Sequence, residues 1–201
     1  MPDAIAVSHP GLTDPVGQSQ EIFRTVLTAL AEPGRVLDLA SAPDVPLGID
    51  AAALAILLTL ADGDTPVWIG GTTDGALAAY LRFHTGAPIV SQARAAQFAV
   101  VVDPSRYLPL SDFDPGVEDF PDRAATVIIG ATALAESGDV ALRGPGIPDR
   151  RRVTIGGLPA RFAADWAENH AEFPCGVDVL FTCGRRILGL PRSIILEAPC
   201  T

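Results

Sequence analysis

Two short segments of the sequence place polar side chains where they could bind a ligand. Asp62-Gly63-Asp64 sets two carboxylates two residues apart, and such a pair can hold a cation. Arg82, His84 and Thr85 gather at the end of an expected helix, where charge-assisted hydrogen bonds could bind a phosphate or phosphonate. Each segment also has a structural interpretation. Asp-Gly-Asp is common turn chemistry, and Arg82 and His84 could offset the negative end of the helix dipole or cap its last carbonyls.

Other segments of the second half allow the same two interpretations. The run 142–147 (LRGPGI) could form an anion-binding nest of backbone amides or only connect two strands. The three arginines at 150–152 are expected on a solvated surface or, alternatively, in an interface. Asp178 lies in an apolar segment, so it either points outward or forms a buried pair, and Cys183 beside Gly184 and Arg185 is either inert or mildly activated.

The chain contains no lysine, because all 14 of its basic residues are arginines. A lysine amine can act as a base or form a Schiff base, whereas a guanidinium stays charged. A pyridoxal-type Schiff base and a Walker A phosphate loop, which both need lysine, are therefore excluded. The sequence also lacks Gly-x-Ser-x-Gly and His-Glu-x-x-His. We expect no catalytic residue, resident cofactor or metal in this chain.

Composition limits the class of protein further. The 201 residues are 48% hydrophobic and 19% charged, as in an ordinary globular protein. A net charge of −10 argues against nucleic-acid binding, which needs a basic surface. The longest apolar run, 51–61, is about half of a membrane span. The three cysteines show neither C-x-x-C nor zinc-ligand spacing, so we expect reduced thiols and a cytoplasmic protein.

The elements that position these residues follow from periodicity and capping signals. Residues 1–16 contain three prolines and no periodicity, so we expect an irregular arm followed by a single domain at 17–201. Ser19 is the expected cap of the first helix, and Thr73 or Asp74 that of the third. Expected helices span 20–31, 51–60, 75–83 and 158–170, and expected strands span 36–39, 66–69, 88–90, 97–102, 125–131, 140–143, 176–182, 186–190 and 193–196.

These elements predict an α/β protein. Helices and strands alternate in the first half, and strands dominate the second. The continuous apolar run at 125–130 is typical of a sheet covered on both faces. We expect a mixed, mostly parallel sheet flanked by helices, with a loop at 103–123 that carries five acidic residues between Asp112 and Asp122.

Eight segments, taken in order, resemble the PhnH family of the bacterial carbon–phosphorus lyase system. They are Phe23-Arg24, Glu32-Pro33-Gly34, LLTLADGDTPVW (57–68), LRFHTGAP (81–88), LRGPGI (142–147), FPCGVD (173–178), TCG (182–184) and LPR (190–192). LADGDTPVW and LRFHTGAP make the resemblance specific because they are long and unusual. The resemblance covers roughly residues 20–197.

The resemblance implies a subunit of a core complex with the proteins PhnG, PhnI and PhnJ. That complex handles alkylphosphonates by coupling a phosphonate to ribose C1 of ATP with release of adenine, so it is a ribose 1-methylphosphonate 5-triphosphate synthase. The resemblance also implies a homodimer in isolation and a fold like that of the pyridoxal-phosphate-dependent transferases without their cofactor site. We expect an assembly or accessory subunit. The alternative is a subunit that binds or converts a phosphate-bearing ligand with Arg82 and His84.

Overall fold

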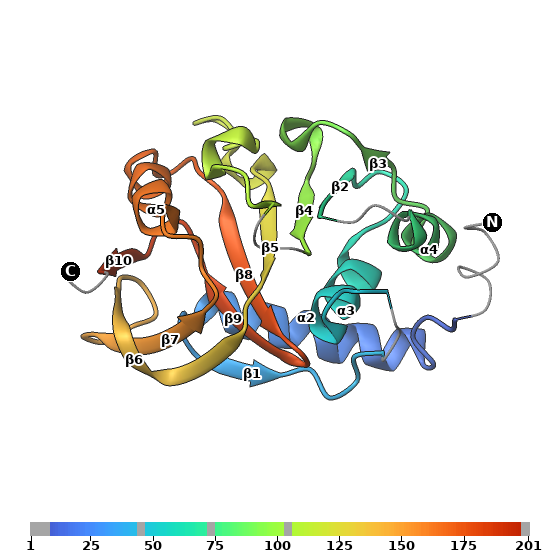
Figure 1. The fold of residues 1–201 in the computed structure, drawn as a ribbon, viewed down its shortest axis with the longest axis horizontal. Coiled ribbons are helices and arrows are strands. Elements are labelled where there is room, and N and C mark those ends of the chain that lie inside the picture. The colour runs from blue at the N-terminus through green and yellow to red at the C-terminus, as the bar shows by residue number, and fades with distance from the viewer. Residues whose placement is uncertain (1–8, 44–46, 72–74, 103–105, 198–201) are drawn as a thin grey trace.

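A seven-stranded mixed sheet forms the centre of the protein (Figure 1). The computed structural model describes residues 9–43, 47–71, 75–102 and 106–197. The strand order is β1-β9-β8-β5-β4-β2-β3, and four of the six pairings, from β8 to β3, are parallel. The strands are β1 (Val36–Asp38), β2 (Val67–Gly70), β3 (Ile89–Val90), β4 (Phe98–Val101), β5 (Thr126–Gly130), β8 (Asp178–Cys183) and β9 (Arg186–Leu190). The predicted α/β class and mixed sheet are confirmed.

In the described residues, four α-helices accompany this sheet: α2 (Pro15–Ala31), α3 (Ala51–Leu60), α4 (Ala76–Thr85) and α5 (Phe162–Ala171). On the central strands, Ile128 and Leu180 belong to the core shared with α2, α3 and α4. Their neighbours Val127 and Val179 belong to the core shared with α5. Because successive side chains of a strand point to opposite faces, this alternation shows that both faces of the sheet are covered.

A second, three-stranded sheet lies on the α5 side of the molecule (Figure 1). Its strands are β6 (Ala133–Arg143), β7 (Arg151–Gly156) and β10 (Ile195–Glu197), in the order β10-β6-β7. The sequence did not predict β7, because the arginines at its start indicated a solvated surface. In the structure, Arg151 donates hydrogen bonds to the carbonyl oxygens of Glu32 and Pro33, and so fastens this sheet to the end of α2.

Element ends differ from the expectations where local caps decide them. Helix α2 begins at Pro15 because the carboxylate of Asp14, rather than Ser19, accepts the amide hydrogen of Gly17 at 3.1 Å. Two residues of the expected arm are therefore helical. The expected caps Thr73 and Asp74 lie outside the described residues. The short 3₁₀ helices Leu110–Asp112 and Pro121–Arg123 lie in the described part of the acidic loop. No helix of the described chain is long and apolar enough to cross a membrane.

Asp50 connects helix α3 to the central sheet. Its carboxylate accepts hydrogen bonds from the hydroxyl of Thr182 at 2.8 Å and from the backbone amide of Gly184 at 2.9 Å. Thr182 lies at the end of β8 and is fully buried. Because a buried hydroxyl needs a partner, this carboxylate fixes the start of an apolar helix against the strand end.

Replacing Asp50 by alanine should therefore destabilise the fold. We expect Asp50→Ala to lower the free energy of unfolding by about 2 kcal/mol, because it leaves a buried hydroxyl and an amide without their acceptor. Urea denaturation measures this change. Asp38→Ala is the matched control, since Asp38 is exposed and should change stability by less than about 0.5 kcal/mol. Equal stability of the two variants would refute the role given to Asp50.

Candidate functional site

The two segments predicted to bind a ligand lie side by side. A Cβ atom placed on Gly86, at the end of α4, would be 3.8 Å from the Cα atom of Gly63. The sheet explains this proximity, because β2 and β3 are parallel neighbours with Val67 opposite Ile89. The connections that lead into two parallel neighbours reach the same edge of a sheet. The turn before β2 and the end of α4 therefore form one corner of the molecule.

Two of the predicted residues use their side chains within this corner. The hydroxyl of Thr85 donates to the carbonyl oxygen of Leu81 at 2.7 Å and accepts the amide hydrogen of Ala87 at 3.1 Å. The carboxylate of Asp62 accepts hydrogen bonds from the hydroxyl of Thr65 at 2.6 Å and from the amide of Asp64 at 3.0 Å. These contacts favour the structural interpretation for Thr85 and Asp62, as a helix end and a turn.

His84 holds the N-terminal segment of the chain. Its ring packs on Tyr80 with a centroid distance of 4.3 Å, and its Nε2 atom lies 3.2 Å from the carbonyl oxygen of His9. The hydroxyl of Tyr80 donates to the next carbonyl oxygen, that of Pro10, at 2.9 Å. Residues 9 and 10 therefore lie against His84, which limits access of a ligand to its ring.

Arg82 and Asp64 keep their side chains available. Both are exposed, and neither side chain forms a hydrogen bond or ion pair with another residue in the described ranges. Arg82 is thus the group in this corner best placed to bind an anion. In residues 9–43, 47–71, 75–102 and 106–197, no three His, Cys, Asp or Glu side chains are grouped so that they could hold a metal ion.

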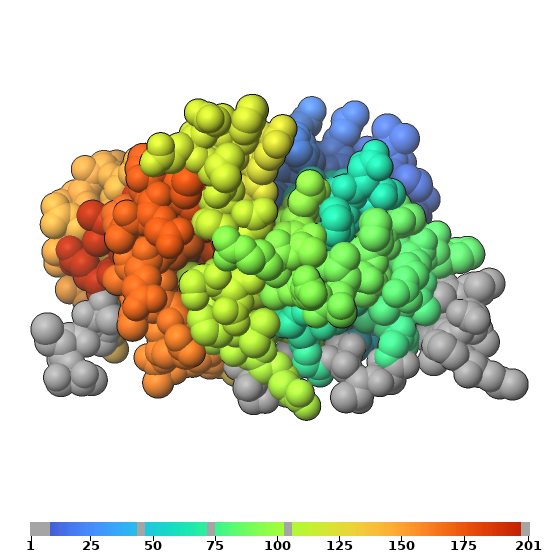
Figure 2. Space-filling view, turned by 90° about the horizontal axis from the view of Figure 1, so that it is seen from above, coloured from blue at the N-terminus to red at the C-terminus, as the bar shows by residue number. Residues whose placement is uncertain are grey.

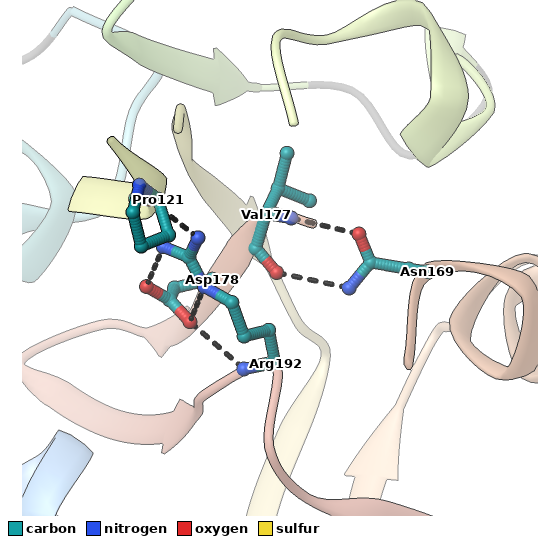
Figure 3. A network of polar contacts seen from close by, with 5 residues as sticks. All are labelled: Pro121, Asn169, Val177, Asp178 and Arg192. Carbon is teal, nitrogen blue, oxygen red and sulfur yellow. Dashed lines mark hydrogen bonds and ion pairs between the residues drawn. The ribbon is translucent and has the colours of Figure 1, made fainter. Parts of the chain in front are cut away.

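A second constellation is an ion pair between Asp178 and Arg192 (Figure 3). Asp178 begins β8 and Arg192 follows β9, and the antiparallel pairing of these strands brings them together. The guanidinium binds both carboxylate oxygens, with Nη2–Oδ2 at 2.7 Å and Nε–Oδ1 at 3.1 Å. The side chain of Arg192 is only 13% exposed and that of Asp178 only 21%. The sequence left two alternatives open for Asp178, and the structure shows the second, in which its carboxylate forms an ion pair.

The residues of this ion pair also connect two further parts of the chain, the acidic loop and α5. Arg192 donates from Nη1 to the carbonyl oxygen of Pro121 at 2.7 Å, which fixes the acidic loop. Its own carbonyl oxygen lies 2.8 Å from Nδ1 of His170 at the end of α5. Asn169 exchanges two hydrogen bonds with the backbone of Val177, next to Asp178 (Figure 3). The loop, α5 and two strand ends are thus held as one unit.

Sequence reasoning found parts of this constellation but not their connection. The segments FPCGVD and LPR contain Asp178 and Arg192, yet nothing in their spacing shows that the two residues are partners. The signal lies in the topology, since a tight turn at Gly184 folds β9 back onto β8. The thiols of Cys175 and Cys183 are free, and Cys200 lies outside the described residues.

A third polar group lies between α5 and the loop before β5. Asp165 is 6% exposed and forms an ion pair with Arg161 at 2.9 Å. The hydroxyl of Tyr107 is buried and has no hydrogen-bond partner of normal geometry among the described residues. Burial raises the pKa of Tyr107, and the negative charge of Asp165 raises it further. Tyr107 therefore stays protonated at neutral pH.

Comparison with known proteins identifies the class to which this α/β protein belongs. The family described as bacterial phosphonate metabolism protein (PhnH) matches residues 10–197. The chain therefore belongs to the PhnH family, and the resemblance drawn from its eight segments is confirmed.

Two relatives extend the match over most of their length. The subunit PhnH of alpha-D-ribose 1-methylphosphonate 5-triphosphate synthase from Rhizobium meliloti (strain 1021) is 36% identical over 187 residues, 92% of each chain. The putative C-P lyase subunit protein HtxG from Stutzerimonas stutzeri is 30% identical over 176 residues, 88% of this chain and 84% of the relative. Both relatives are named as subunits.

The ion pair predicts that substitutions at Asp178 and Arg192 are coupled in their effect on the free energy of unfolding. Asp178→Asn and Arg192→Leu should each lower the free energy of unfolding by about 2–3 kcal/mol, because each leaves a partly buried charge without its partner. The double variant should lose less than the sum, and urea denaturation of all three gives the coupling energy. Arg35→Leu, which breaks the exposed Arg35–Glu32 pair, is the control and should cost at most about 1 kcal/mol. Additive losses at Asp178 and Arg192 would contradict the interpretation.

The hydrogen bonds in the turn at Asp62 lead to a prediction about the pKa of this residue. The Thr65 hydroxyl and the Asp64 amide donate to the charged carboxyl and lower the pKa of Asp62. The stabilisation that this charge gives the turn is complete above the ordinary pKa, and it is lost as the pH falls through the lowered value. Thr65→Val should raise the pKa of Asp62 toward its ordinary value in a carbon-13 NMR titration. Thr85→Val should leave it unchanged, because that hydroxyl donates to Leu81 instead.

Proposed function

We propose that this chain is an accessory subunit of the carbon–phosphorus lyase core complex. In that role it supports the coupling of an alkylphosphonate to ribose C1 of ATP with release of adenine. One observation carries the proposal: the 36% identity, across 92% of both chains, with the PhnH subunit of a ribose 1-methylphosphonate 5-triphosphate synthase. Shared identity over nearly the whole length makes a shared place in the complex the simplest inference.

The chemistry of the chain supports an accessory rather than a catalytic role. The sequence has no lysine for covalent catalysis. Thr85, Asp62 and His84 direct their polar atoms to neighbouring residues of the same chain. Few groups in this corner are then left to take part in bond making or breaking.

The proposal includes the assembly and the compartment. We place the chain with PhnG, PhnI and PhnJ in the cytoplasm, and as a homodimer when isolated. We also propose that its fold is that of the pyridoxal-phosphate-dependent transferases without the cofactor site. The mostly parallel seven-stranded sheet supports that likeness, and the missing lysine agrees with the loss of the cofactor.

A second candidate function rests on Arg82. Its guanidinium is exposed and unpaired among the described residues, in the last turn of α4. An unpaired guanidinium at a helix end can bind a phosphate or phosphonate with charge-assisted hydrogen bonds. In this function the chain would bind the ATP triphosphate or the phosphonate for the other subunits.

Activity assays with and without this chain test the accessory role. We expect the isolated chain to release no adenine from ATP and methylphosphonate, and the assembled four-subunit complex to release it. Omission of this chain should reduce the release, because the complex loses a subunit on which its assembly depends. Turnover by the isolated chain would overturn the accessory role.

Calorimetry with ATP and methylphosphonate separates the two candidates. If Arg82 binds the anion, Arg82→Ala should weaken binding by about 10- to 100-fold, the effect of losing a hydrogen bond to a charged group. Arg24→Ala is the matched control, because Arg24 is exposed on α2 and has no side-chain partner among the described residues. Equal binding by wild type and Arg82→Ala would remove the second candidate.

A further inference from the structure

An apolar surface lies at the end of the molecule where the parallel strands begin. Val117, Phe120 and Phe173 are 56%, 46% and 59% exposed. Figure 2 looks onto this end, where the yellow-green loop before β5 lies beside the orange segment that follows α5. Large apolar side chains that gather on a surface indicate a site of protein contact, whereas scattered ones do not.

A shallow hollow lies within this surface. Three prolines and Phe173 supply its apolar lining, and Asp178 and Arg192 are among its polar lining residues. The lining consists of Pro121, Asp122, Phe173, Pro174, Pro191, Ser193, Asp178 and Arg192. Rings of proline and phenylalanine offer flat apolar walls that lose little conformational freedom on binding. Such a hollow suits a single apolar side chain of a partner.

The Asp178–Arg192 ion pair, which forms part of the lining of the hollow, also fixes a neighbouring loop (Figure 3). Arg192 holds the carbonyl oxygen of Pro121 at 2.7 Å. The guanidinium of Arg123 lies over the ring of Phe120, with 4.2 Å from Cζ to the ring centroid. The Pro121 side of the hollow is therefore fixed before a partner arrives, which reduces the entropy lost on binding.

Unpaired acidic residues accompany the hollow. Glu118, Asp119 and Asp122 in the loop and Glu172 beside Phe173 are exposed. None of them takes part in an ion pair among the described residues. The apolar centre with an acidic rim is complementary to a partner with an apolar side chain and basic neighbours.

We propose that this surface, which we call the Phe120–Phe173 surface, docks a basic segment of another protein subunit whose apolar side chain enters the hollow. The proposal rests on the function proposed above, since an accessory subunit acts through such contacts. A second copy of this chain fits less well. A symmetric pairing would place the acidic rim of one copy against that of the other, and the chain carries a net charge of −10.

Binding to the other subunits tests the proposal. The fluorescently labelled chain is titrated with co-purified PhnG, PhnI and PhnJ at low and high salt. We expect the double variant F120S/F173S to bind about 10- to 100-fold more weakly, because it removes the central apolar contacts. The charge-reversal variant E118R/D119R/D122R should associate more slowly and lose most of the salt dependence of the association rate.

Matched variants at other places control for general effects. Phe83→Ser removes an apolar side chain that is 60% exposed on α4. D38R/D139R/D149R reverses three exposed carboxylates outside the Phe120–Phe173 surface. Circular dichroism checks that every variant is folded. The proposal is overturned if F120S/F173S binds like wild type, or if the controls weaken binding as much.

Binding of a short peptide tests the Phe120–Phe173 surface independently of the complex. We expect an acetylated peptide of alternating arginine and leucine to shift the amide NMR signals of residues 117–120, 122, 123, 172 and 173. The corresponding glutamate–leucine peptide should shift none of them. If the wild-type chain binds no other subunit, the proposed function is wrong. The NMR shifts still show whether the Phe120–Phe173 surface binds a basic segment with apolar side chains. Absence of the shifts, or self-association that depends on Phe120 and Phe173 in sedimentation experiments, would contradict the proposal.

Discussion

The ion pair between Arg192 and Asp178 is the contact on which one half of the molecule depends. It joins the start of β8 to the chain after β9, and through Pro121 it also fixes the acidic loop. His170 and Asn169 add α5 to the same unit. A guanidinium with several donors in a plane can serve a carboxylate and a carbonyl at once, which one ammonium group could do only with poorer geometry.

Much of the fold was predictable because its signals are local. The apolar runs at 51–60 and 125–130 indicated an element buried on all sides and a sheet covered on both faces, and the structure contains both. Strand β7 and the first half of β6 were not predictable in this way. Arg151 and Arg152 have no apolar pattern, and a register shift between Ala135 and Val140 interrupts the alternation of β6. These elements form because tertiary contacts outweigh local preference.

The candidate site was predictable in composition but not in arrangement. The sequence showed which polar residues the two segments contain, and the parallel pairing of β2 with β3 explains why the segments meet at Gly63 and Gly86. Hydrogen bonds within the chain determine which of these side chains remain free to bind a ligand. The residue types alone do not reveal those hydrogen bonds. The partner of Asp178 was hidden for the same reason, because Arg192 lies on another strand end and reaches it through the turn at Gly184.

The absence of lysine has a structural consequence as well as a chemical one. Arg151 donates to the carbonyl oxygens of Glu32 and Pro33, and Arg185 to those of Ala40 and Ala42. Arg94 reaches the carbonyl oxygens of Ser111 and Phe113 in the same way. A planar guanidinium can bind two carbonyls of one loop while it remains charged and partly hydrated. Arginine thus fastens loops in this chain, and a protein that uses its cations to hold itself together leaves few of them, Arg82 and Arg24 among them, for other molecules.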